Sequence, residues 1–123
     1  MAKQVRRAKG LFLELHDELI GVDIDFSTFD PSIHAPEHIS MARLVWADRV
    51  RTEFRSVQIM TRFLSEVMAA NDPLEVYAGA GDLIMDELRH VSLCVRVVDA
   101  LGGAAHYPCL LYTSPSPRDR VLS

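Results

Sequence analysis

The chain of 123 residues is long enough for one domain at most. Its 17 acidic residues outnumber its 13 Lys and Arg residues, and it has no dense basic block, so its charge pattern argues against a nucleic-acid partner. Apolar residues make up 49% of the chain and charged residues 24%, which is typical of a globular protein with a packed core and excludes a disordered chain.

The sequence carries no recognisable signal for export or membrane insertion. An apolar run begins at Leu11 after a basic N-terminus, but acidic residues such as Glu14 and Asp17 interrupt it, unlike the core of a secretory signal. No stretch approaches the roughly 20 apolar residues of a membrane-spanning helix. The two cysteines, Cys94 and Cys109, are too few for a disulfide framework. We therefore expect a cytoplasmic protein without a membrane partner.

Residues 1–35 are expected to form an N-terminal helix and a loop. Apolar side chains at helical spacing predict a short helix over Ala2–Ile20, with one side formed by Val5, Ala8, Phe12, Leu15 and Leu19. Between Gly21 and Ala35 the pattern gives way to Asp, Ser, Thr and Pro, which predicts a loop.

Residues 36–108 are expected to form a helical domain built on two long rods. The first runs from about Pro36 to Ala70 without internal Gly or Pro and ends at the turn signal Asn71-Asp72-Pro73. The second runs from about Pro73 to Leu101 and ends at Gly102-Gly103. Rods joined by so short a turn form an antiparallel hairpin, and neither can bury its apolar stripe alone. The predicted fold class is all-α, a long-helix hairpin that forms half of a four-helix bundle.

Each rod has an apolar stripe that recurs every three or four residues and contains ionisable side chains. The stripe of the first rod is Trp46, Val50, Glu53, Val57, Met60, Leu64 and Val67. The stripe of the second is Val76, Ala80, Leu83, Glu87, His90, Cys94, Val97 and Leu101. An unpaired buried carboxylate costs several kcal/mol, so acidic groups in such stripes need a positive partner. A bound cation would provide it.

Glu87-Leu88-Arg89-His90 is a Glu-x-x-His motif, in which the carboxylate and the imidazole project side by side from one helix. Counted from the turn, Glu53 lies roughly 19 residues before its centre and His90 roughly 18 after, so the two are nearly level, whereas Glu87 is displaced by ~6 Å. Carboxylates with imidazole and without paired thiolates suit iron or manganese and disfavour a structural zinc site. Glu53, Glu87 and His90 are therefore the predicted metal ligands.

The arrangement of Glu53 on one long helix and Asp86-Glu87-Leu88-Arg89-His90 on the next resembles the first half of a ferritin-like diiron-carboxylate bundle. The stretch Glu87–Gly103 is also similar to bacterial ferritin-like proteins of undefined activity. The resemblance implies a diiron centre and O2-dependent oxidation, oxygenation or iron oxidation. Manganese in place of iron is the alternative that the ligand chemistry leaves open. It also implies that Asp86 orients a ligating histidine from the opposite helix pair. A second Glu helix and a second Glu-x-x-His are absent, so the chain holds three of six ligands.

The last residues resemble something other than protein sequence. From Cys109 to Asp119 they match the translation of a transposase-derived sequencing adapter, so we interpret 109–123 as a non-native tail and exclude it from the fold. We then expect the native sequence to continue beyond Pro108. The chain would be an N-terminal fragment, and the reaction would require the complete protein.

Two alternatives to the fragment hypothesis remain open. Two copies of the hairpin can dimerise and together provide six ligands across a two-fold axis. Alternatively, the chain is a helical interaction module in which the polar seam residues only set the register and no metal binds.

Other candidate side chains are interpreted as structural. Cys94 is expected to be a core residue. The cluster of His34, Glu37 and His38 is expected at the surface near the start of the first rod. Arg49, Arg51, Arg55 and Arg62, which alternate with Asp48 and Glu66, indicate a solvated, ion-paired face. The aromatic residues Trp46, Phe54 and Phe63 are expected in the core.

Overall fold

The computed structural model describes residues 2–21, 24–104 and 106–108. These residues form mainly helices, which confirms the predicted all-α class. The elements in chain order are β1 (Ala2–Gln4), α1 (Leu11–Leu19), the single-turn 3-10 helix η1 (Pro31–Ile33), α2 (Pro36–Ala69), α3 (Leu74–Ala100) and β2 (His106–Pro108). The interpretation of 109–123 as an adapter-derived tail lies outside the described residues.

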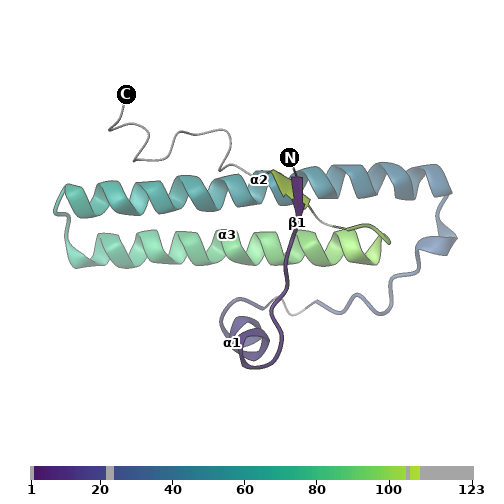
Figure 1. Cartoon of the computed structure of the whole chain (residues 1–123), viewed down its shortest axis with the longest axis horizontal. Helices are drawn as coiled ribbons and strands as arrows, with labels where there is room; N and C mark the ends of the chain where they lie inside the picture. The colour runs from purple at the N-terminus through teal and green to yellow at the C-terminus, as the bar shows by residue number, and fades with distance from the viewer. Residues whose placement is uncertain (1, 22–23, 105, 109–123) are drawn as a thin grey trace.

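The two long helices α2 and α3 lie side by side and antiparallel, joined by a short turn (Figure 1). Pro36 occupies the first turn of α2, where its missing N–H costs no hydrogen bond. After α2, Asn71 adopts a positive φ of 57°, and its N–H donates to the Met68 carbonyl. Asn tolerates this left-handed conformation better than most residues. Both helices end within one residue of their predicted bounds.

The C-terminal end of α3 is closed by two glycines and an arginine. Gly102 has a φ of 76°, and the N–H groups of Gly102 and Gly103 donate to the carbonyls of Asp99 and Val98. This pair of bonds is the Schellman motif that commonly terminates helices. The guanidinium of Arg43 on α2 donates to the Leu101 carbonyl from Nε at 3.0 Å and from Nη2 at 2.7 Å. The end of α3 is thereby fixed to α2.

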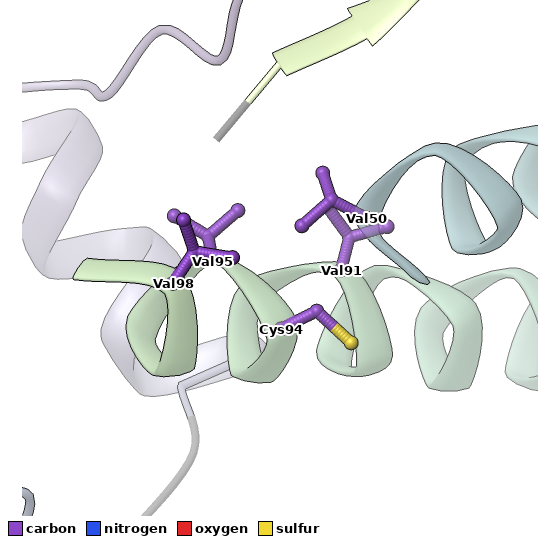
Figure 2. Packing of buried hydrophobic residues seen from close by; sticks show 5 residues of the cluster. All are labelled: Val50, Val91, Cys94, Val95 and Val98. Atoms are coloured by element: carbon purple, nitrogen blue, oxygen red, sulfur yellow. The ribbon is translucent and has the colours of Figure 1, made fainter. Parts of the chain in front are cut away.

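The buried core lies between α2 and α3, toward the C-terminal part of α3. Val50 of α2 packs among four α3 residues, Val91, Cys94, Val95 and Val98 (Figure 2). The Val50 and Val98 side chains are completely buried. Cys94 is buried too, which confirms its interpretation as a core residue.

The N-terminal segment differs from its prediction. The helix expected over Ala2–Ile20 begins only at Leu11, and the first residues form β1, which pairs antiparallel with β2. Gly10, with a φ of 61°, separates the two parts. The backbone of residues 2–4 is hydrogen-bonded to a segment about a hundred residues away, so a long-range contact overrides the local helical pattern. Between Gly21 and Ala35 the described residues form a loop with only the short η1, as predicted.

The apolar stripes predict buried side chains, but on one side of the hairpin several of these side chains are exposed. All seven residues of the first stripe are buried or half-buried, whereas Val76, Leu83 and His90 of the second are exposed. Phe63, expected in the core, is exposed as well. Two helices enclose only the seam between them, and no described segment covers the side on which these four residues lie.

Among the described helices, none is both long enough and apolar enough to cross a membrane.

Candidate metal centre

The three predicted ligands converge at the seam between α2 and α3. Glu53, Glu87 and His90 each offer one ligand atom, and these atoms all lie within 4.8 Å of one another. His90 Nδ1 lies 3.5 Å from Glu53 Oε2 and 3.4 Å from Glu87 Oε2. The ~6 Å axial displacement expected for Glu87 therefore does not keep its carboxylate away from the other two groups. In the part of the chain that the structure describes, no other group of three such side chains meets in this way.

The site is half enclosed. The Glu53 and Glu87 side chains are 15% and 23% exposed, whereas the His90 side chain is 54% exposed. The carboxylates thus lie at the seam, and the imidazole lies at its open edge. Two atoms bound to one ion at about 2.1 Å are at most about 4.2 Å apart. His90 Nδ1 lies closer than this to an oxygen of each carboxylate, so the three groups are near enough to share one cation.

The two carboxylates repel each other. Burial is the largest cause that raises the pKa of Glu53, and the hydrogen bond and the negative charge of Glu87 raise it further. The charges of His90 and Arg49 oppose this rise without cancelling it. The charged form of Glu53 is therefore disfavoured, first because the carboxylate is partly removed from water and second because a second carboxylate lies beside it. A cation between the carboxylates would offset both costs.

Arg49 is a member of the site that sequence reasoning assigned to the solvated face. Its Nη2 lies 3.8 Å from Glu53 Oε1, and its guanidinium carbon lies 5.6 Å from the centroid of the Trp46 ring. The Trp46 ring thus helps to hold the Arg49 guanidinium beside the Glu53 carboxylate. The four-residue spacing of Arg49 and Glu53 is the sequence signal that could have revealed this contact. A shallow groove along α2 that reaches Glu53 is lined by Leu44, Val45, Asp48, Arg49, Thr52 and Glu53.

Cys94 lies one helical turn after His90, but its thiol is not among the three converging ligand atoms. Burial raises the pKa of Cys94, and the negative charge of Glu53 raises it further. A thiol held in its neutral form is a poor metal ligand and a poor nucleophile. Cys94 therefore acts as a packing residue next to the site.

The remaining candidates lie away from the cluster. The Asp86 carboxylate accepts a hydrogen bond from Arg89 Nη1 at 2.6 Å, and its predicted role toward a histidine of another helix pair stays a prediction. His34, Glu37 and His38 are exposed at the start of α2, as expected. Arg51 pairs with Asp48 at 2.5 Å on the exposed face, which agrees with the ion-paired surface predicted there.

No protein-family model matches the chain, and neither a curated protein nor a solved structure is significantly similar to it. The assignment of a metal centre therefore depends on the geometry of the three side chains and on the Glu-x-x-His spacing.

Proposed function

We propose that the hairpin binds a redox-active divalent metal through Glu53, Glu87 and His90 and supplies half of a ferritin-like dimetal centre. Two carboxylates and one imidazole form an oxygen-rich ligand set that suits iron and manganese. Iron is our first choice because of the resemblance to the diiron-carboxylate bundles. The convergence of the three ligand atoms within 4.8 Å at the seam of two long helices carries the proposal. A pair of helices with this ligand set is the repeating unit of the ferritin-like four-helix bundle.

Each ligand has a distinct task at such a centre. The carboxylates of Glu53 and Glu87 lie together at the seam, where they would hold the metal through their oxygens. His90 would provide a ring nitrogen at the open edge of the seam and would bind the metal as a neutral imidazole. A bound iron pair supplies O2-dependent oxidation, oxygenation or iron oxidation. The hairpin fixes the ligands on rigid helices and shields the carboxylates from water.

Metal content measured on matched variants tests this proposal. The full chain is equilibrated with Mn(II), or with Fe(II) under anaerobic conditions, then desalted and analysed for bound metal. We expect about one ion per chain, and a loss of at least tenfold in affinity for Glu87→Gln and for His90→Ala. Glu66→Gln and His34→Ala remove an exposed carboxylate and an exposed imidazole elsewhere and should change nothing. The proposal would be contradicted if Glu87→Gln and His90→Ala bound as much metal as the wild type.

A specific contact favours a second candidate, a helical interaction module without a metal. His90 Nδ1 lies within hydrogen-bonding reach of both carboxylates, and Arg49 lies beside Glu53, so the polar groups partly neutralise one another. Such a network would set the register of a helical assembly. Chelation distinguishes the two functions. The melting temperature of an interaction module is indifferent to added chelator or Mn(II), whereas a metal protein is stabilised by the ion.

A further inference from the structure

The exposed side of the hairpin next to the ligands has the pattern of an interface. On α3, Val76, Leu83, His90 and Val97 recur every seven residues, and so form one line along the helix. On α2, the neighbouring line carries Val45, Ser56 and Phe63 beside Glu53. Because His90 of the first line contacts Glu53, the two lines border the same side of the seam. We call this side, with Val45, Phe63, Val76 and Leu83, the open face.

The open face differs from the other side of the hairpin. On that other side the N-terminal segment lies against the helices: Val5 packs on the core, and Leu13 and Ile20 line one cavity together with Leu88. Within the described residues, no segment packs against the open face, where Val45, Phe63, Val76 and Leu83 remain exposed. Large apolar side chains lined up along both helices in this way mark an interaction surface.

The metal site on the open face is incomplete. Three protein ligands leave an iron or manganese ion with about half of an octahedral shell unfilled. Two copies of the site hold four carboxylates and two imidazoles, and the four negative charges balance two divalent cations. This is the ligand set that a bundle with two Glu helices and two Glu-x-x-His helices provides. A second copy of the hairpin contributes one helix of each kind.

The position of the site along the helices also fits a second copy. Glu53 lies at the middle of α2, and Glu87 is equally far from Leu74 and Ala100 at the ends of α3. A two-fold axis through the ligands, perpendicular to the helices, would therefore superpose the two hairpins over their full length. Ligands near one end would instead leave much of each open face uncovered. A two-fold interface uses the same surface on both copies, as this arrangement requires.

We infer that the open face binds a second copy of this chain, which completes a four-helix bundle and a dimetal centre shared between the two protomers. This inference rests on the proposed metal function. Each copy contributes Glu53, Glu87 and His90, and the apolar lines of Val45, Phe63, Val76 and Leu83 pack on either side of the ions. Dimerisation and metal binding are then linked, and each strengthens the other.

The test uses light scattering coupled to size-exclusion chromatography, with Mn(II) as the probe and metal analysis of each peak. We expect the full chain with Mn(II) to have twice the protomer mass and to hold two ions per dimer. Leu83→Glu places a charge on the open face and should raise the dissociation constant of the dimer at least tenfold. Leu74→Glu is the matched control: Leu74 is 76% exposed and Leu83 47%, and their spacing of two and a half turns places them on opposite sides of α3.

The outcomes separate this inference from the metal function. A monomer that binds one Mn(II) through the three ligands would contradict the proposed dimer but would agree with the metal site. A chain that holds no metal would overturn the metal function, and the shared centre with it. A dimer that Leu74→Glu weakens as much as Leu83→Glu would place the interface elsewhere and overturn the inference. Val45→Glu, on α2, provides an independent second variant, and circular dichroism verifies that each variant retains its helices.

Discussion

Replacing Glu53 with glutamine should make the metal-free protein more stable and the metal-loaded protein less stable. Burial and Glu87 raise the pKa of Glu53, so the folded chain binds a proton at this position more tightly than the unfolded chain does. Protonation of Glu53 therefore stabilises the fold, and this contribution to the free energy of unfolding is fully present at pH values below the usual glutamate pKa. It is lost as the pH rises through the raised pKa. At neutral pH the charged carboxylate therefore destabilises the metal-free fold, and a glutamine of the same shape does not.

The size of the effect follows from the geometry. Two unit charges within 4.8 Å of each other repel by at least about 0.9 kcal/mol in water and at least about 3.5 kcal/mol at an effective dielectric constant of about 20. Attraction by Arg49 and His90 offsets part of this repulsion, so we expect Glu53→Gln to gain about 1 kcal/mol without metal. A metal at a hundredfold excess over its dissociation constant stabilises the wild type by about 2.7 kcal/mol. The order of stabilities should therefore reverse on metal addition.

Thermal unfolding of both proteins, with chelator and with Mn(II), measures the reversal. One kcal/mol corresponds to about 4 °C in melting temperature for a chain of this size. The advantage of Glu53→Gln in chelator should disappear below about pH 4, where the wild-type carboxyl is protonated as well. Glu66→Gln, which removes an exposed carboxylate of α2, should melt like the wild type in every condition. Equal stabilisation of wild type and Glu53→Gln by Mn(II) would refute the reasoning.

Three further substitutions test the site and the fold. His90→Ala should change the metal-free stability by less than about 0.5 kcal/mol, because the side chain is half exposed. It should lower the melting-temperature gain with Mn(II) by at least half, and an unchanged gain would show that His90 is not a ligand. Val98→Ala, at a completely buried position, should cost about 2 kcal/mol in urea unfolding, whereas Val45→Ala should cost far less; equal costs would mean that the core is elsewhere. Gly102→Ala should cost about 1 kcal/mol in the same assay because Gly102 has a positive φ, and a neutral result would argue against the helix end described above.

Local sequence signals were sufficient to predict the long helices and the meeting of the ligands. The absence of Gly and Pro within α2, the turn at Asn71 and the glycines after Leu101 set the helix ends to within one residue. Once the turn was placed, counting along both helices predicted that His90 would lie opposite Glu53, as it does.

The differences arise where contacts are long-range or where a surface has no described partner. The pairing of β1 with β2 joins the two ends of the described chain, so no local pattern could predict it. Leu83 and His90 belong to an apolar stripe, and periodicity marks such a stripe as facing a partner without showing whether the partner belongs to the same chain. The contact of Arg49 with Glu53 and Trp46 was missed because charged residues at helical spacing usually indicate solvent exposure.

The most direct test of the metal centre is a crystal of the full chain soaked with Mn(II), with anomalous diffraction recorded at a wavelength where manganese scatters strongly. We predict an anomalous peak at the seam of α2 and α3, within bonding distance of Glu53, Glu87 and His90. A crystal with manganese bound at other sites, and with no peak between these three side chains, would contradict the central claim.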